Sequence, residues 1–274
     1  MHLNRIIMNK ALSFLVLLIF TFITLSSNAS VEVIGSLKYI FNTNPGEVVR
    51  GQIRIQNSDP IDQEVRIYQT DYLYNFQEQT FYDEPGIQGG NKRSNAGWIQ
   101  YSPKTVVLKA KESRNVEFEI STPSGDSIFG TYWSAIMVEG VTPIDPNQKG
   151  DLSIRTVTRY SVQIVNEINK KGAGLLKFME PTLIKEGTNK LFLAIDIINE
   201  GAHYIAPELN MELYDESGTL VKTITAPKKG LYPTTSTRFK LDLEGLPAKK
   251  TYTAMIVAAG QDDDVFGLEY TLYF

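Results

Sequence analysis

The sequence predicts an all-β protein built from two successive sandwich domains. The main observation is a strand that occurs twice, because residues 131–140 align without a gap on residues 251–260. Threonine, tyrosine, isoleucine and glycine recur in register, and an alternating apolar strand precedes each copy. Since a strand repeated in the same surroundings indicates a repeated unit, we expect two β domains of one plan.

Two further elements repeat in the same order upstream. Residues 49–56 alternate apolar with polar side chains and end at Asn57, and residues 191–198 end in the same way at Asn199. Another strand follows in each half, at residues 64–70 and 208–214. Four matching elements in one order support the duplication more strongly than a single match would.

The rest of the chain reads as short strands broken by turn clusters, with no sustained helical period after the amino terminus. Regular short strands are typical of immunoglobulin-like sandwiches, which we place at residues 30–170 and 171–274. The join is expected near residues 169–174, which are polar and contain glycine. Residues 75–97 are predicted to form an exposed long loop, with a small hairpin at residues 80–82.

The amino terminus predicts export. Arg5 and Lys10 precede an uncharged, mostly apolar run from Ala11 to Leu25, and small residues follow up to Ala29. This is the pattern of a signal peptide covering residues 1–29, and the run is shorter than the ~20 residues that a membrane-spanning helix needs. The expected location is therefore the periplasm or the cell surface.

The composition excludes several classes of protein. The chain has no cysteine, so neither a disulfide framework nor a lipid on a cysteine is available. Its formal net charge is −4, with acidic and basic residues interspersed, so nucleic acid is not an expected partner. No segment after the signal peptide is apolar enough to span a bilayer, and we expect no transmembrane anchor.

Catalytic and metal-binding patterns are weak. The mature chain contains a single histidine, His203, which lies just after a turn and far from any serine-bearing elbow motif. The run from Asp262 to Asp264 could bind calcium but is also typical of a solvated turn. Glu78, Asp83 and Glu84 have no spacing that favours a glycosidase acid pair. We therefore predict no enzyme activity, no cofactor and no metal.

Aromatic residues crowd one stretch before residue 102. They are Tyr68, Tyr72, Tyr74, Phe76, Phe81, Tyr82, Trp98 and Tyr101. The first four share one parity and could line a strand face in the core, whereas Phe81 and Tyr82 are better candidates for exposed rings. Exposed aromatic residues at this density would suit recognition of a carbohydrate or a protein.

In the first half, a strand leads to residues 41–46, a proline-strand-turn-strand stretch covers residues 101–116 and an aromatic strand lies at residues 127–133. In these features the first domain resembles the amino-terminal domain of PapD-like periplasmic pilus-assembly chaperones. A long strand with alternating basic residues, 152–164, closes the domain. The resemblance covers about half of the mature chain.

The tandem also resembles the surface proteins of Gram-positive bacteria that accompany WxL-domain proteins. Those proteins are likewise exported pairs of such domains, and residues 222–274 fit their closing strands. They carry a carboxyl-terminal transmembrane segment, for which this sequence offers no apolar run.

The chaperone resemblance implies that the strand at residues 152–164 is lent to a partner subunit that lacks a strand. The implied contact row is Leu152, Ile154, Tyr160, Val162 and Ile164, with Arg155 and Arg159 on the opposite face. Such chaperones hold the subunit's terminal carboxylate with two cations, for which the resemblance implies Arg159 and Lys38. The alternative is an ordinary closing strand of the first sandwich.

We therefore predict an exported, non-enzymatic interaction protein, chaperone-like for pilus or cell-surface assembly, whose partner is a pilin-like or surface subunit. The alternative is a cell-surface binding or adhesion module that recognises a host protein or a glycan through the aromatic loop.

Overall fold

The computed structural model describes residues 31–125, 127–141, 157–169, 174–187, 190–260 and 264–274. The predicted signal peptide, and residues 170–173 of the join predicted near residues 169–174, lie outside the described residues. Apart from one short 3-10 helix, η1 (Ala96–Trp98), the regular elements of the described chain are strands. This confirms the predicted all-β class.

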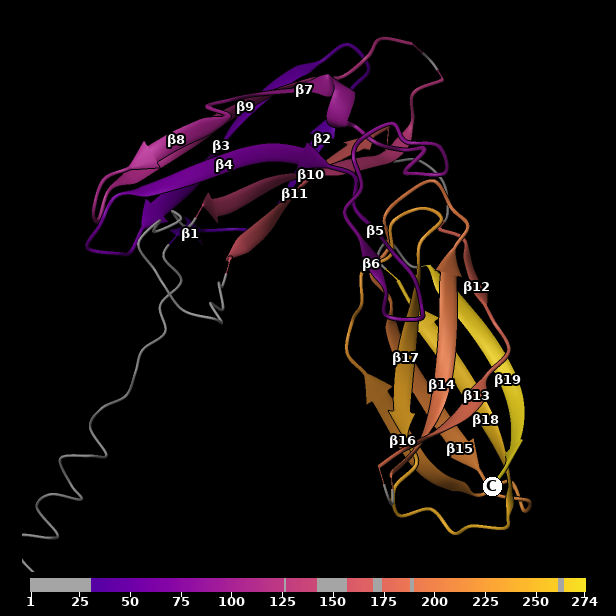
Figure 1. Ribbon diagram of the computed structural model, residues 1–274. Helices are drawn as coiled ribbons and strands as arrows, with labels where there is room; N and C mark the ends of the chain where they lie inside the picture. The colour runs from indigo at the N-terminus through magenta and orange to yellow at the C-terminus, as the bar shows by residue number, and fades with distance from the viewer. Residues whose placement is uncertain (1–30, 126, 142–156, 170–173, 188–189, 261–263) are drawn as a thin grey trace, which may run out of the picture.

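The first sandwich consists of two facing sheets (Figure 1). One has four strands, in the order β1 (Val31–Ile34), β3 (Val48–Asn57), β9 (Ser113–Ser121) and β7 (Ile99–Ser102). The other has five strands, in the order β2 (Lys38–Thr43), β11 (Arg159–Ile168), β10 (Gly130–Val141), β4 (Gln63–Thr70) and β8 (Thr105–Leu108).

Alternating side chains explain why these strands form a sandwich. Ile53 and Ile55 on β3, and Val116, Phe118 and Ile120 on β9, are buried, while the residues that alternate with them face solvent or are only partly covered. Because successive side chains of a strand point to opposite faces, one face of each sheet becomes apolar and packs on the other sheet.

The second sandwich repeats the plan with its own core. One sheet contains β12 (Leu176–Phe178), β13 (Thr182–Glu186), β14 (Lys190–Asn199) and β17 (Ser236–Asp242), with β14 in the middle. The other has the order β16 (Leu220–Ala226), β15 (Glu208–Tyr214), β18 (Thr251–Ala259) and β19 (Val265–Tyr273). Leu193, Phe239 and Ile256 lie in the core between the two sheets.

The two copies of the repeated strand occupy equivalent places. In the first sandwich β10 lies between β4 and β11, and in the second β18 lies between β15 and β19. The aligned residues Ile136 and Ile256 both belong to the core of their own sandwich. Strand pairing within the described residues therefore agrees with the duplication seen in the sequence.

A hairpin from the first sandwich reaches the second. This hairpin is β5 (Leu73–Tyr74) paired with β6 (Thr80–Phe81), and Figure 1 shows it descending beside β14 and β17. The hairpin predicted at residues 80–82 thus begins earlier in the chain than expected, and those residues supply only its second strand. The backbone N–H of Phe76 donates a hydrogen bond to Ser236 Oγ on β17 at 3.1 Å. The start of the long loop therefore contacts the second sandwich, while residues 77–82 and 84–89 are exposed, as the sequence predicted.

A search of the described helices for a membrane-spanning segment finds none of sufficient length and hydropathy.

Candidate functional site

The edge of the five-stranded sheet is only partly covered. Strand β2 runs parallel to β11 and pairs with it from Lys38, opposite Gln163, to Thr43, opposite Ile168. The N–H of Gln163 donates to the carbonyl of Leu37 at 2.8 Å, so the odd-numbered residues of β11 direct their main-chain groups toward β2. Among the described strands, none pairs with Arg159 or Ser161 on this side. Within the part of the chain that the structure describes, the first part of β11 therefore presents an unpaired edge.

Lys38 marks the end of this unpaired edge and lies among aromatic rings from the second sandwich. Its ammonium is 3.6 Å from the centroid of the Tyr204 ring and 4.9 Å from that of Tyr232. Burial lowers the pKa of Lys38 to about 8, and the nearby charge of Glu167 acts in the opposite direction. Within the described part of the chain, no carboxylate forms an ion pair with Lys38. An anion bound here would relieve the cost of burying this charge.

Hydrogen bonds hold the aromatic rings around Lys38 in place. The Tyr232 hydroxyl donates to Gln163 Oε1 at 2.7 Å, and the Tyr74 hydroxyl donates to the carbonyl of Gly230 at 2.6 Å. A Cβ atom on Gly230 would collide with the Tyr204 hydroxyl, so only glycine permits this close approach. These hydrogen bonds connect the hairpin, β11 and the second sandwich into one continuous surface beside Lys38.

These groups enclose a hollow of about 390 Å³ between the two sandwiches. It is lined by Lys38, Tyr72, Tyr74, Gln163, Tyr204, Lys229, Gly230, Tyr232 and Thr237. Its volume falls in the range of small-ligand sites, and its described lining contains two ammonium groups and no carboxylate. We call it the cleft hollow and take it, together with the unpaired edge of β11, as the candidate functional site.

The residues of the predicted contact row fall into three groups. Val162 and Ile164 are fully buried in the core of the first sandwich, so their side chains are not accessible to a partner in this structure. Tyr160 is partly buried and packs against the same core. Leu152 and Ile154, like Arg155 of the opposite face, lie outside the described residues.

The structure does not bring the two predicted cations together. Lys38 is opposite Gln163, and Arg159 lies four residues earlier on β11, on the same face of the sheet. That separation is roughly 13 Å along the strand at about 3.3 Å per residue. Arg159 Nε donates to Glu139 Oε2 at 2.7 Å, and the Tyr68 hydroxyl donates to the same carboxylate at 2.8 Å. The group facing Lys38 across the strand pair is thus an amide and not a second cation.

Sequence reasoning missed Gln163, Lys229, Tyr204 and Tyr232 as parts of the site. Three of these come from the second sandwich, and nothing in their local sequence shows that they reach Lys38. The sequence indicated only that Lys229 and Gly230 lie in a turn cluster between predicted strands, which is a weak indication of a binding site.

His203 lies at the junction between the sandwiches. It is buried, and its Nδ1 is 3.4 Å from Glu167 Oε2, while the Thr131 hydroxyl donates to Glu167 Oε1 at 2.6 Å. The hydroxyl is therefore bonded to the carboxylate and not to the imidazole, which is not the order that activates a nucleophile. These contacts link the two sandwiches, and we interpret His203 as a residue that stabilises the junction.

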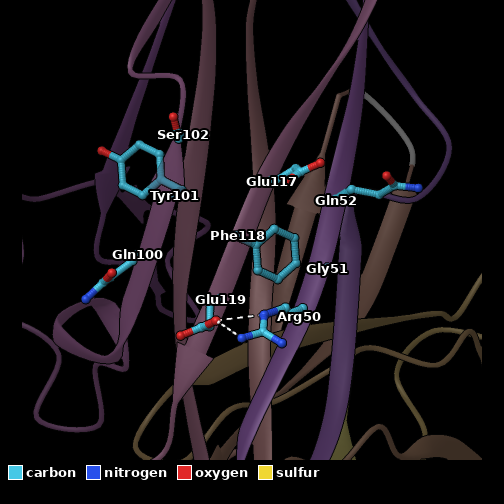
Figure 2. A pocket seen from close by; sticks show the side chains of 9 residues that line it. All are labelled: Arg50, Gly51, Gln52, Gln100, Tyr101, Ser102, Glu117, Phe118 and Glu119. Carbon is cyan, nitrogen blue, oxygen red and sulfur yellow. Dashed lines mark hydrogen bonds and ion pairs between the residues drawn. The ribbon is translucent and has the colours of Figure 1, made fainter.

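Among the described residues, hollows also lie outside the cleft. One, of about 630 Å³, lies beside β3, β7 and β9, and Arg50 and Glu119 are paired there at 2.6 Å. Figure 2 shows the side chains that line it. Arg50 and Glu119 therefore already neutralise each other. The second, of about 580 Å³, lies between residues 83–92 and the second sandwich and is lined in part by Phe81, which is 42% exposed.

The acidic run predicted as a weak calcium candidate contributes a structural contact. Asp264 Oδ2 accepts a hydrogen bond from the N–H of Gly174 at 2.8 Å, while Asp262 and Asp263 lie outside the described residues. Within the described ranges, no three His, Cys, Asp or Glu side chains gather in a way that could hold a metal ion.

Comparison with known proteins finds likeness at the level of structure only. No protein-family model matches the chain, and no curated protein matches it. Among solved structures, it is similar to a chaperone–tip adhesin complex of CFA/I fimbriae, with 13% identity, a TM-score of 0.48 and coverage of 89% of this chain and 98% of that chain. It is also similar to the class 5 fimbriae chaperone CfaA, with 12% identity, a TM-score of 0.46 and coverage of 88% and 98%.

A third similar structure is that of the SafB chaperone bound to the SafA pilin of Salmonella enterica, with 11% identity, a TM-score of 0.42 and coverage of 90% and 98%. At such identities no residue role is carried over from these proteins to this chain.

Proposed function

We propose that this chain is an exported, non-enzymatic chaperone-like protein that captures a protein subunit by its carboxyl-terminal strand. The partner strand pairs with the unpaired edge of β11, and its terminal carboxylate is held by Lys38. The observation that carries the proposal is the position of Lys38, a partly buried cation at the point where β2 begins and the unpaired edge ends.

The direction of β2 sets the direction of the partner. Since β2 runs parallel to β11, a strand that continues the line of β2 toward Arg159 would run the same way, and its carboxyl end would meet Lys38. The described part of this edge, from Val157 to Gln163, spans roughly 20 Å at about 3.3 Å per residue, enough for several main-chain hydrogen bonds.

Apolar side chains mark both ends of the edge. Val157 is 47% exposed at its start, and Leu37 is 44% exposed beside Gln163. A partner strand could cover these two side chains while its main chain pairs with Arg159 and Ser161. Val162 and Ile164 face the core of the first sandwich and cannot contact the partner. The affinity for the partner strand would therefore come mainly from main-chain hydrogen bonds.

Peptides that differ only in their carboxyl end test the proposal. A strand peptide of alternating valine and threonine, with lysines at its amino end for solubility, is prepared as the free acid and as the terminal amide. We expect the intact chain to prefer the acid by roughly 10- to 100-fold, the effect of one or two charge-assisted hydrogen bonds. Lys38→Gln should remove this preference. Equal binding of acid and amide by the unaltered chain, or no binding of either, would overturn the proposal.

Arg159→Ala tests the second cation that the resemblance implies. Because Arg159 is paired with Glu139 and lies roughly 13 Å from Gln163 along β11, we expect the preference for the free acid to survive this change. A loss equal to that of Lys38→Gln would assign the carboxylate to Arg159 instead.

The 580 Å³ hollow beside the long loop favours a second candidate function, recognition of a glycan. Phe81 offers an exposed ring there, and the side chains of Asp83, Gln88 and Lys92 supply hydrogen-bonding groups around it. An aromatic face flanked by polar groups suits a sugar ring. Phe81→Ala on a glycan array tests this role, and an unaltered chain that binds no sugar would exclude it.

A further inference from the structure

A second lysine in the cleft hollow comes from the other sandwich. Lys229 lies in the connection between β16 and β17, and its side chain lines the same 390 Å³ space as Lys38. The hollow is therefore bounded by one cation from each domain.

Backbone and aromatic contacts fix the position of Lys229. Its ammonium donates to the carbonyl of Arg238 at 2.6 Å and lies 5.5 Å from the centroid of the Phe239 ring. An ammonium has three donors, so this bond leaves two for a ligand. Burial lowers the pKa of Lys229, which indicates that its charge is poorly compensated in the unbound protein.

The charged groups around the two lysines have other partners. Glu78 faces Lys229 but is paired with Lys240 at 3.4 Å. Glu167 faces Lys38 but accepts the Thr131 hydroxyl and lies beside His203. Neither carboxylate lines the cleft hollow. The hollow thus presents two positive charges that the described side chains within it do not neutralise.

We infer that Lys229 makes the cleft selective for a partner whose carboxyl-terminal residue is acidic. The inference rests on the proposed function, because Lys38 takes the terminal carboxylate and leaves Lys229 for the side-chain carboxylate of the same residue. A glutamate or aspartate at the end of a strand carries two carboxylates one side chain apart. The cleft hollow of about 390 Å³ has room for such a residue.

The test compares two strand peptides that differ only in the last residue. Both have the alternating valine–threonine sequence and a free carboxyl terminus, and one ends in glutamate while the other ends in glutamine. Binding of each is measured to the intact chain and to Lys229→Gln. The matched control is Lys228→Gln, which makes the same change at the neighbouring exposed position.

We expect the unaltered chain and Lys228→Gln to bind the glutamate peptide about 10-fold more tightly than the glutamine peptide, as one charge-assisted hydrogen bond would give. Lys229→Gln should bind the two peptides equally, with little change for the glutamine peptide. This difference between peptides separates a binding role from a loss of folding, which would weaken both.

Two contrary results have distinct meanings. If the unaltered chain binds both peptides equally and Lys38→Gln weakens both, strand capture stands and the selectivity by Lys229 is wrong. If the affinity of neither peptide depends on Lys38, the proposed function fails and the inference fails with it.

Discussion

Trp133 and Tyr232 stack face to face across the junction of the two sandwiches, with ring centroids 4.6 Å apart and ring planes within 9°. Trp133 lies on β10 of the first sandwich, and Tyr232 precedes β17 of the second. Both rings are almost completely buried. The stack therefore fixes the second sandwich against the strand that neighbours β11, and it positions the wall of the cleft hollow.

Replacing Tyr232 should uncouple the two sandwiches. Tyr232→Ala removes a buried aromatic ring and should lower the free energy of unfolding by about 3–5 kcal/mol. Tyr232→Phe removes only the hydrogen bond to Gln163, which should cost about 1 kcal/mol. Calorimetry should show one transition for Tyr232→Phe and two for Tyr232→Ala. Equal, small losses in both variants would show that the stack does not hold the junction.

Lys38 should reduce stability at neutral pH. Its pKa is lowered to about 8 in the folded protein from 10.5, so the unfolded chain binds more protons between these values and stability rises with pH across that window. Lys38→Met keeps the apolar stem without the charge. We expect it to melt at a higher temperature than the unaltered chain at pH 7, with the difference shrinking as the pH approaches 10.5. A lower melting temperature for Lys38→Met at pH 7 would contradict the burial of this charge.

Tyr252 should stabilise the second sandwich in two ways. Its ring is 2% exposed, and its hydroxyl donates to the carbonyl of Pro247 at 2.8 Å, as expected for a tyrosine that bonds a neighbouring turn. Chemical denaturation should show a loss of about 1 kcal/mol for Tyr252→Phe and ~3 kcal/mol or more for Tyr252→Ala. Losses that do not differ between the two variants would place the ring outside the core.

The ionised carboxylate of Asp71 should destabilise the folded protein at neutral pH. It is 1% exposed, its carboxylate oxygens lack hydrogen bonds of normal geometry, and burial raises its pKa. The folded state therefore holds the proton more tightly than the unfolded chain, and stability falls as the pH rises above the unfolded value of about 3.9.

Asp71→Asn should therefore be more stable than the unaltered chain at pH 7 and show a smaller advantage, or none, near pH 3. Urea titrations at the two pH values measure this difference. An advantage that is the same at both would mean that ionisation of Asp71 does not matter.

The fold was predictable because its signals are local. Alternation in β3 and β9 and the repeat of β10 in β18 follow from the period-2 placement of side chains on strands. A hairpin was predicted at residues 80–82, and Thr80–Phe81 form the second strand of one that begins at Leu73. Within a sandwich, the alternation of side chains in each strand thus predicts which of its faces is buried in the core.

The candidate site was predictable only in part. Lys38 was identified through the chaperone resemblance, but Tyr204, Lys229 and Tyr232 approach it from more than one hundred residues away, and no periodicity encodes that contact. Tyr72 and Tyr74 were expected in a sandwich core or on an exposed loop. They lie instead in a cluster at the junction of the two domains, with Trp133 and Tyr232. A contact between domains leaves no pattern in a single strand.

Amide hydrogen exchange at the edge of β11 tests the central claim most directly. The intact chain is saturated with the free-acid strand peptide, and the exchange of the Arg159 and Ser161 N–H groups is followed by NMR. We predict that both amides exchange at least about ten-fold more slowly in the complex, because the added strand pairs with them. Unchanged exchange at both residues, in a sample where the peptide is shown to be bound, would contradict strand capture at β11.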